Sequence, residues 1–289
     1  MTSAAGETVI PFLKMHGAAN DFVVVDHRRA FLPSAGIELA DLVRRLCDRR
    51  RGVGADGVLL LENAAEADAS MRYLNADGGE AEYCGNGVRC LARFALELGL
   101  GHGGVVRLAT AVGVQETRRS AAGIVIRFGH VEAPGPAFAI EALGHGFSGR
   151  QVQVGVPHFV VPYDPLSRVQ VQEWGGALRR HPHFGRDGAN VDFVARRADS
   201  NVSMRTYERG VEGETLACGS GAIATAVWAA TEGARSPVRV RTAGGDILIV
   251  GFEAREAGYE VTLDGPAEAV FRGEWRDGGD SFPPAPGGA

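Results

Sequence analysis

Two stretches of this chain repeat one pattern, and the repeat limits the possible folds more than any other feature. Residues 80–94 read Glu-Ala-Glu-Tyr-Cys-Gly-Asn-Gly-Val-Arg-Cys-Leu-Ala-Arg-Phe, and residues 214–228 read Glu-Thr-Leu-Ala-Cys-Gly-Ser-Gly-Ala-Ile-Ala-Thr-Ala-Val-Trp. In both, Cys-Gly-Asn-Gly or Cys-Gly-Ser-Gly follows a Glu at the same distance and precedes a small, apolar helical run. Because Cys84 and Cys218 are separated by nearly half of the 289 residues, we expect two structurally equivalent halves, each with strands wrapped around a helix entered at a glycine.

Short strand-like runs bounded by Gly, Asp or Pro recur along the whole chain, which favours antiparallel or mixed sheet. They lie at residues 22–25, 57–61, 104–108, 123–128, 151–154, 159–161, 191–194, 238–241, 246–250 and 259–263. Helical patterns are fewer, at 36–49, 87–98, 167–180 (with weaker periodicity) and 221–232. The fold class predicted is α+β (α/β mixed): two pseudo-symmetric domains, each a mixed, mostly antiparallel sheet around a central helix.

Charge and hydropathy argue against several classes of protein. The net charge is -5 with no basic block, so electrostatic binding to nucleic acid is not expected. The longest apolar stretch, Ala217–Ala230, is interrupted by glycines and is shorter than the ~18 residues that a bilayer span needs. The first residues, MTSAAGETVIPF, lack the basic and apolar regions of a signal peptide. We therefore expect a cytoplasmic enzyme that binds neither nucleic acid nor membrane.

The cysteines and the lysine limit the chemistry. Cys84 and Cys90 are not at a zinc-ligand spacing, and the sequence has no Cys-x-x-Cys pair. Four cysteines in a chain of this length do not suggest a disulfide scaffold, and Cys47 fits a buried position in an amphipathic run. Lys14 is the only lysine, so any Schiff-base mechanism, including one with pyridoxal phosphate, would have to use it. We expect neither a metal nor a cofactor.

Cys84 and Cys218 each precede a predicted helix, where unpaired backbone N–H groups and the helix dipole favour negative charge. In such places the pKa of a thiol, ordinarily about 8.5, can fall to about 3.5–7.5. Two pseudo-symmetric domains would present the two thiols to one cleft from opposite sides. Inversion of a carbon centre needs a base on one face and an acid on the other, with backbone N–H groups stabilising charge delocalised into the substrate carboxylate. Spacing alone leaves core cysteines and a redox disulfide equally open.

Further motifs make the chain resemble the diaminopimelate epimerase family of two-cysteine racemases, which work without pyridoxal phosphate. They occur in the family's order from about residue 11 to about residue 272. The matching motifs are Met15-His-Gly-Ala-Ala-Asn-Asp-Phe22, Gly52-Val-Gly-Ala-Asp56, Asn75-Ala-Asp-Gly-Gly-Glu80 with Cys84-Gly-Asn-Gly-Val-Arg-Cys90, Gly155-Val-Pro-His158, Gly188-Ala-Asn190, and Tyr207-Glu-Arg-Gly210 with Cys218-Gly-Ser-Gly221. The paired Cys-Gly-x-Gly, with a Glu-Arg pair upstream of the second, is the most specific of these motifs.

The resemblance implies a role for each matching residue. Cys84 and Cys218 correspond to the acid/base pair. Arg209 corresponds to the residue that binds the distal carboxylate, and a guanidinium can bind a carboxylate through two hydrogen bonds. Glu208 and His158 correspond to polar groups beside the reacting centre. The remaining correspondences are substrate-binding side chains at Asn20, Asn75 and Asn190, and backbone donors to the α-carboxylate at Gly219 and Ser220, mirrored by Gly85 and Asn86.

The same resemblance implies the organisation and the reaction. The first domain should span residues 1–128 with a returning strand at about 265–277, and the second residues 129–264, with the active site in the cleft between them. The Gly/Pro-rich residues 278–289 are expected to be disordered. The expected reaction is cofactor-independent epimerisation of LL-2,6-diaminopimelate to meso-diaminopimelate, by a thiol and a thiolate, for lysine and peptidoglycan precursors. The enzyme is expected to be a homodimer.

Alternatives and departures accompany this interpretation. A racemase of another amino acid, such as histidine or proline, on the same fold is the nearest competitor, against which Arg209 and Glu208 argue. A thiol redox protein would need Cys84 and Cys218 alone, and a silent binding module would not need both cysteines.

The chain departs from the family pattern at Ala19, Gly57, Val156 and Ile223, and in a loop longer by one residue at Glu212-Gly213. None of these changes affects the paired cysteines or Arg209.

Overall fold

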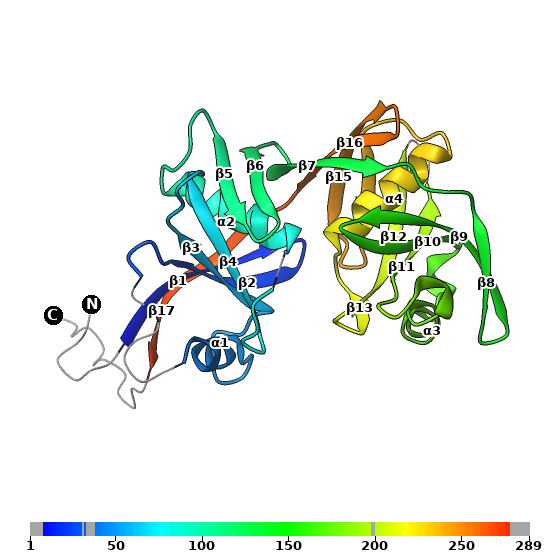
Figure 1. Ribbon diagram of the computed structural model, residues 1–289. Helices are drawn as coiled ribbons and strands as arrows, with labels where there is room; N and C mark the ends of the chain where they lie inside the picture. The colour runs from blue at the N-terminus through cyan, green and yellow to red at the C-terminus, as the bar shows by residue number, and fades with distance from the viewer. Residues whose placement is uncertain (1–7, 31, 33–37, 82, 198–199, 278–289) are drawn as a thin grey trace.

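The computed structural model describes residues 8–30, 32, 38–81, 83–197 and 200–277, and it shows two lobes side by side (Figure 1). Strand β7 (Ile124–Glu132) leaves the first lobe for the second, and the chain returns through β16 (Gly258–Gly265) to β17 (Glu268–Asp277). β17 pairs antiparallel with β1 (Thr8–Gly17), at the opposite end of the sequence. The predicted disordered tail, 278–289, lies outside the described residues. Within the described part of the chain, no helix has the length and apolar character required to span a bilayer.

The first lobe places its strands around one helix, α2 (Gly85–Glu97), and carries a second helix, α1 (Leu39–Cys47), packed near β3 and β4. Its strands after β1 are β2 (Asn20–Asp26), β3 (Gly57–Glu62), β4 (Ala69–Asn75), β5 (Val105–Thr110) and β6 (Gly113–Arg119). Along β1 to β7 the successive pairings are antiparallel, parallel, antiparallel, parallel, antiparallel and antiparallel.

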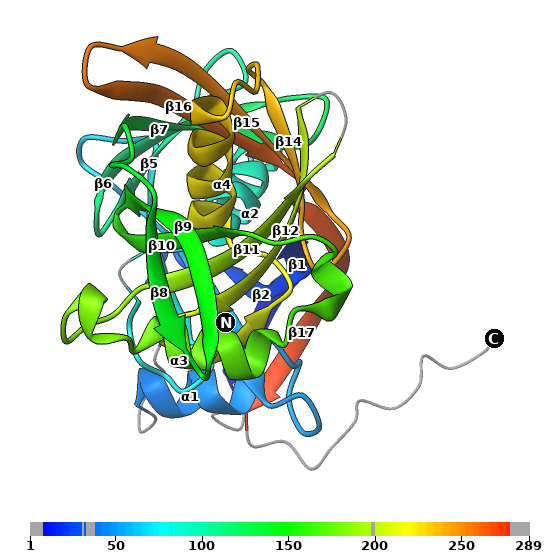
Figure 2. The ribbon, with the colours of Figure 1, turned by 90° about the vertical axis from the view of Figure 1, so that its right-hand side faces the viewer.

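The second lobe repeats this series around α4 (Gly219–Thr231), which its strands enclose in Figure 2. Its strands before β16 are β9 (His145–Val154), β10 (Val156–Pro162), β11 (Asn190–Arg196), β12 (Asn201–Glu208), β14 (Val238–Arg241) and β15 (Ile247–Arg255). From β9 to β16 the successive pairings are again antiparallel, parallel, antiparallel, parallel, antiparallel and antiparallel. The mixed α/β fold with two repeated halves, predicted from the repeat in the sequence, is confirmed.

The central helices are buried because their sequences leave little polar surface. α4 is apolar around its whole circumference, and Gly221 to Ala229 are all buried, as expected for a helix with no solvent face. α2 also buries residues through most of its length, including Val88, Leu91 and Phe94. Each helix therefore forms the centre of its own hydrophobic core, and its first turn has a fixed position relative to the surrounding strands.

Some elements differ from the sequence prediction. The predicted helix at 167–180 is only partly present: the 3-10 turn η1 (Leu166–Arg168) is separate, and the π-helical turn η2 (Val171–Gly175) continues directly into α3 (Gly176–Arg179), with η3 (Pro182–Phe184) beyond. Gly175 keeps a helical backbone, and a Cβ there would lie 2.5 Å from the Cβ of Tyr207, so the absence of a side chain allows this segment to pack closely against β12. β1, β4, β6 and β12 were not predicted, and neither were the short strands β8 (Phe138–Ala142) and β13 (Gly213–Thr215).

Candidate active site

Cys84 and Cys218 occupy the same position in the two lobes, the N-cap of the central helix. Both have extended backbone, and each Sγ accepts a hydrogen bond from a backbone N–H three residues on, Gly87 N or Gly221 N, at 3.4 Å. Both cysteines are free thiols, with Cys84 partly buried and Cys218 buried. The sequence prediction that each cysteine precedes a helix is confirmed.

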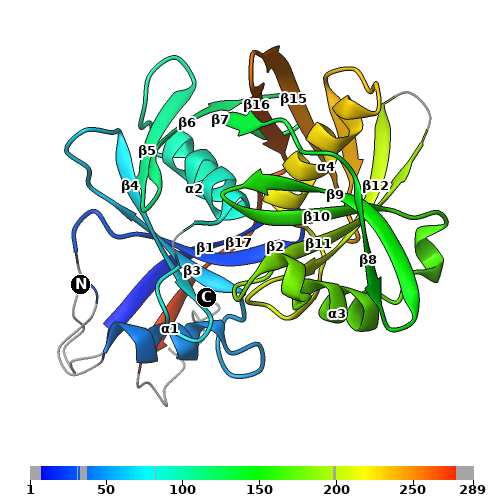
Figure 3. The same cartoon turned by 45° about the vertical axis from the view of Figure 1, so that its right-hand side comes forward.

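The first turns of the two helices meet where the lobes join. α2 and α4 are in contact, and Figure 3 shows both directed towards the junction of the lobes. Gly85 and Gly219 lie against the same side chain, since a Cβ on either would be 3.8 or 3.3 Å from Leu263 Cδ2. A Cβ on Gly219 would also lie 4.0 Å from Asn86 Oδ1. The predicted helix-start residues of both lobes are therefore brought together.

Burial controls the ionisation of both thiols. Burial raises the pKa of Cys84 to about 11, and the Glu208 carboxylate also raises it, against the lowering effect of the Gly87 N–H. Burial likewise raises the pKa of Cys218 well above its usual value, and the charges of Glu208 and Asp192 add to this effect. The expectation that the helix N-termini lower both pKa values is wrong for the ligand-free protein, because the loss of solvation outweighs the backbone N–H groups.

Glu208 is the side chain that both thiols share. It ends β12, and its Oε2 accepts a hydrogen bond of 2.9 Å from Thr215 Oγ1. Burial raises its pKa, while hydrogen bonds with Thr215 and with the Cys218 thiol lower it. A carboxylate whose pKa is raised beside a thiol is suited to accept the proton of that thiol.

Asn20 and Asn86 surround Cys84 from the first lobe. Cys84 Sγ donates to Asn20 Oδ1 at 3.5 Å, and Asn86 Nδ2 donates to the same oxygen at 3.3 Å. Asn86 Oδ1 in turn accepts from the fully buried Arg89 at 2.7 Å. Arg89 was not among the predicted site residues, although it lies in the Cys-Gly-Asn-Gly-Val-Arg motif. It holds the amide of Asn86 from a position three residues further along the same helix.

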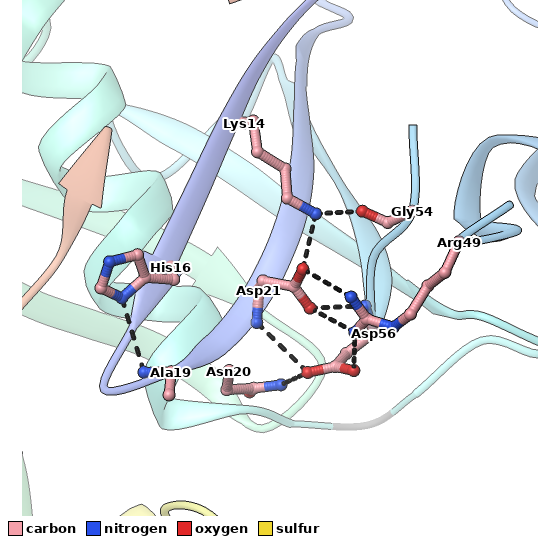
Figure 4. A network of polar contacts seen from close by, with 8 residues as sticks. All are labelled: Lys14, His16, Ala19, Asn20, Asp21, Arg49, Gly54 and Asp56. Atoms are coloured by element: carbon pink, nitrogen blue, oxygen red, sulfur yellow. Dashed lines mark hydrogen bonds and ion pairs between the residues drawn. The ribbon is translucent and has the colours of Figure 1, made fainter. Parts of the chain in front are cut away.

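A network of charged side chains supports Asn20 on its other side (Figure 4). Asn20 Nδ2 donates to Asp56 Oδ2 at 2.7 Å, and Arg49 joins Asp56 (2.6 Å) to Asp21 (2.7 and 3.0 Å). Lys14 Nζ donates to Asp21 Oδ2 at 2.6 Å and to the Gly54 carbonyl. Burial would raise the pKa of Asp21, but hydrogen bonds from Arg49 and Lys14 outweigh it and lower this pKa to about 2. The only lysine of the chain is thus held in an ion pair.

The second lobe contributes another set of buried polar groups. His158 and Asn190, on the neighbouring strands β10 and β11, lie side by side with Nε2 of the first 3.2 Å from Nδ2 of the second. Asn190 Oδ1 accepts a hydrogen bond of 2.7 Å from the backbone N–H of Arg209. Ser220 Oγ lies 3.4 Å from Cys218 Sγ. The structure therefore brings His158, Asn190, Glu208 and Ser220 into contact with other predicted site residues.

Two predicted substrate-binding residues have side chains without a partner among the residues that the structure describes. Within the described part of the chain, neither the Arg209 guanidinium nor the Asn75 amide makes a hydrogen bond or ion pair. Asn75 ends β4 opposite Gly57 in the first lobe, one residue beyond the pair of Leu74 with Val58. Glu208 has the equivalent place in the second lobe, one residue beyond the pair of Tyr207 with Val191. Both side chains are therefore available to a polar ligand.

Other possible ligand positions lie elsewhere. A cavity of about 560 Å³ is bordered by both lobes along β6, β7, β15 and β16, and it contains none of the predicted site residues. Among the residues that the structure describes, no three His, Cys, Asp or Glu side chains are grouped as metal ligands would be. The polar groups named above are therefore the best candidate for an active site.

Comparisons with known proteins agree with this arrangement. The diaminopimelate epimerase family model matches residues 12–132 and 150–270, one segment in each lobe. Diaminopimelate epimerase of Aquifex aeolicus is 40% identical over 274 residues, covering 91% of this chain and 96% of the relative. The enzyme of that name from Methanocella arvoryzae is 37% identical, covering 92% and 97%.

Solved structures share the fold at much lower identity. A Bacillus anthracis phenazine biosynthesis protein of the PhzF family has a TM-score of 0.68 at 14% identity, covering 93% of this chain and 99% of that one. A hydroxyproline epimerase from Agrobacterium vitis has a TM-score of 0.65 at 18% identity, covering 93% and 92%. With the family model matching in both lobes and relatives of 37–40% identity over nearly the whole length, the chain belongs to the diaminopimelate epimerase family.

Proposed function

We propose that this protein is an isomerase that converts LL-2,6-diaminopimelate to meso-diaminopimelate, for the synthesis of lysine and peptidoglycan precursors. The observation that carries the proposal is the pair of N-cap thiols, Cys84 and Cys218, on helices from the two lobes that meet at their first turns. Membership of the family and relatives named diaminopimelate epimerase support the choice of substrate. Inversion of a carbon centre requires an acid on one face of the carbon and a base on the other.

The reaction at the α-carbon consists of two proton transfers, which follow the ionisation of one thiol. For turnover in one direction, Glu208 takes the proton of Cys218, and the resulting thiolate removes the α-proton of the substrate. The thiol of Cys84 delivers its proton to the opposite face of the same carbon, which inverts the centre. In the reverse direction Cys84 is the base and Cys218 is the acid. The charge that develops on the α-carboxylate is stabilised by the backbone N–H groups of the two helix starts, at Gly85, Asn86, Gly219 and Ser220.

The remaining polar groups bind the rest of the substrate. The unpaired guanidinium of Arg209 holds the distal carboxylate in a bidentate contact. The amides of Asn20, Asn75 and Asn190 bind the polar groups of the zwitterion. His158, which contacts Asn190, lies beside the reacting centre.

We propose that the first domain comprises residues 1–128 and the strand at 265–277, and the second residues 129–264. The protein is further proposed to be a cytoplasmic homodimer that needs no metal or cofactor.

The test uses the four cysteines as matched pairs. Cys84→Ala and Cys218→Ala should abolish conversion of LL- to meso-diaminopimelate. Cys47→Ala and Cys90→Ala, which remove buried thiols away from the helix N-caps, should retain most activity. Dialysis against EDTA should leave the wild-type rate unchanged. Near-normal turnover in Cys84→Ala would show that the two-thiol mechanism is wrong.

A further inference from the structure

A fully buried carboxylate lies beneath the first turn of α4, and the mechanism above assigns it no part. Asp192, on β11, is 0% exposed. Its Oδ1 accepts a hydrogen bond of 2.6 Å from Thr206 Oγ1, and its Oδ2 lies 2.7 Å from Nδ1 of His158, which is also 0% exposed. A Cβ on Gly221 would approach Asp192 Oδ1 to 2.6 Å. The carboxylate therefore lies directly against the helix that Cys218 begins.

The first lobe has an apolar side chain in the same place. A Cβ on Gly87, which corresponds to Gly221 in the other helix, would meet Leu59 Cδ2 at 3.1 Å. The strand registers agree with this equivalence. In the first lobe Phe22 pairs with Gly57 and Leu59 with Tyr73; in the second the corresponding pairs are His158 with Asn190 and Asp192 with Thr206.

At equivalent positions the first lobe therefore has apolar side chains and the second lobe has polar ones. Phe22, Leu59 and Tyr73 belong to one hydrophobic core, and the rings of Phe22 and Tyr73 pack edge to face at 5.8 Å. A buried carboxylate needs several hydrogen bonds to offset its lost hydration, and replacement of buried ionic groups by apolar ones of similar size is often neutral or stabilising. The first lobe shows that the fold accepts an apolar side chain, Leu59, at this position. The stability of the fold therefore does not explain why the second lobe has a buried carboxylate, Asp192, there.

The hydrogen bonds of the second lobe form a chain whose direction is determined at one end. The backbone N–H of Arg209 can only donate, so Asn190 Oδ1 is the acceptor and Asn190 Nδ2 faces His158. Since an amide nitrogen only donates, His158 Nε2 must be the acceptor. The remaining ring nitrogen, Nδ1, then carries the hydrogen and donates it to Asp192 Oδ2. One carboxylate therefore completes a chain that ends at the backbone of Arg209.

We propose that Asp192 is a positioning residue for the second lobe of the active site: it holds His158 as the neutral Nδ1–H tautomer, and through His158 it sets the amide orientation of Asn190 and the backbone position of Arg209. The part of the proposal that concerns turnover rests on the proposed epimerase function. The second hydrogen of Asn190 Nδ2 is left for the substrate, because an amide nitrogen has two donors and the chain uses one. Among the described residues of the first lobe, which has Leu59 at this position, no such chain is present.

The direct test is the tautomer of His158 in the ligand-free protein. Long-range proton–nitrogen correlation spectra of protein labelled with nitrogen-15 distinguish Nδ1–H from Nε2–H, and a His158→Gln variant assigns the signals. Wild type should show Nδ1–H. Asp192→Leu, which copies the side chain of the first lobe, should lose that signature, whereas Asp192→Asn should keep it because an amide oxygen can still accept. Leu59→Ala, the matched change in the other lobe, should lower Tm and leave the tautomer unchanged.

Kinetics supply the second readout. Misplacement of a binding group by about 1 Å can cost on the order of 100-fold in rate, so we expect a fall of that order in kcat/KM for Asp192→Leu and a fall below tenfold for Asp192→Asn. Asp192→Ala also lacks the acceptor and replaces Asp192→Leu if that variant does not fold.

The outcomes separate the two proposals. An Nε2–H tautomer in wild type, or an unchanged tautomer in a folded Asp192→Leu variant, would overturn the positioning role. A changed tautomer with unchanged kcat/KM would also overturn it. Absence of epimerase activity in wild type would instead refute the proposed function, while the test of the tautomer would stand.

Discussion

At the scale of single residues, burial and the charge on Glu208 set the chemistry of the two thiols. Both Sγ atoms receive a backbone N–H at 3.4 Å, yet burial raises the pKa of each thiol above its usual value. The ligand-free protein therefore holds Cys84 as a thiol at neutral pH. Protonated thiols protect a resting enzyme from alkylation, because the thiolate is the nucleophile.

This ionisation state predicts slow alkylation of Cys84. With a pKa of about 11, the rate of reaction with iodoacetamide should be low at pH 7 and should rise as the pH approaches 11. Glu208→Gln removes a charge that raises this pKa, so the pH profile should shift to lower pH. Peptide mapping by mass spectrometry gives the rate at Cys84. Glu214→Gln, whose side chain pairs with Arg205, is the control, and a profile that moves equally in both variants would contradict the account.

The substrate is tested at Arg209, whose guanidinium has no partner within the described residues. A Lys ammonium cannot reproduce a bidentate contact, so Arg209→Lys should lower kcat/KM for diaminopimelate. Arg209→Ala should lower it further, by several kcal/mol in transition-state stabilisation, since truncation of one partner of a buried charge pair costs roughly 2–5 kcal/mol. Arg239→Ala, on the exposed face of β14, is the control. Unchanged diaminopimelate turnover in Arg209→Ala would indicate another amino acid as the substrate.

The network behind Asn20 has a pH dependence of its own. The pKa of Asp21 is about 2, below its usual 3.8. A lowered folded-state pKa means that the ionised carboxylate stabilises the fold above about pH 4 and that this contribution is lost as the pH falls towards 2. Denaturant titrations between pH 5 and pH 2 should show this loss in wild type and less of it in Asp21→Asn. Equal losses in the two proteins would show that the ion pairs of Figure 4 contribute nothing.

At the scale of elements, the first turns of α2 and α4 differ in what lies beneath them. Alanine favours a helix interior over glycine by about 1 kcal/mol, but a Cβ on Gly221 would lie 2.6 Å from the buried Asp192 carboxylate. On Gly87 it would lie 3.1 Å from the methyl end of Leu59. Overpacking typically costs about 1–3 kcal/mol. Gly221→Ala should therefore reduce the free energy of unfolding more than Gly87→Ala, as measured by urea denaturation; the reverse order would contradict the packing described here.

The elements also show what the sequence could and could not predict. The helices that begin at Cys84 and Cys218 were predictable because the repeat marks both their starts and their apolar runs. β1 contains Pro11, and β4 and β12 alternate polar with buried side chains, so neither a continuous apolar run nor a short turn marks them. The contacts of Asp56 with Asn20 and of Asp192 with His158 depend on the pairing of parallel strands. Residues more than thirty positions apart meet there, and no local pattern records it.

At the scale of the whole molecule, two lobes with the same series of strand pairings place two helix starts against one side chain, Leu263. The repeat in the sequence predicted this symmetry, and the structure adds the asymmetry within it. Beneath the first turn of its central helix the first lobe has the apolar side chain of Leu59, whereas the second lobe has Asp192 and a chain of buried polar groups. The proposed active site, built from two similar halves, thus has two chemically different sides.

The central claim, that two thiols act on opposite faces of one carbon, is tested most directly by epimerisation of LL-diaminopimelate in deuterium oxide. Wild-type protein should produce meso-diaminopimelate with deuterium at the inverted α-carbon, because the proton removed by one thiol is replaced from the other, which has exchanged with solvent. Early in the reaction the remaining LL substrate should contain little deuterium. Product that retains the original α-proton, or labelled product formed at the wild-type rate by Cys84→Ala or Cys218→Ala, would contradict the account.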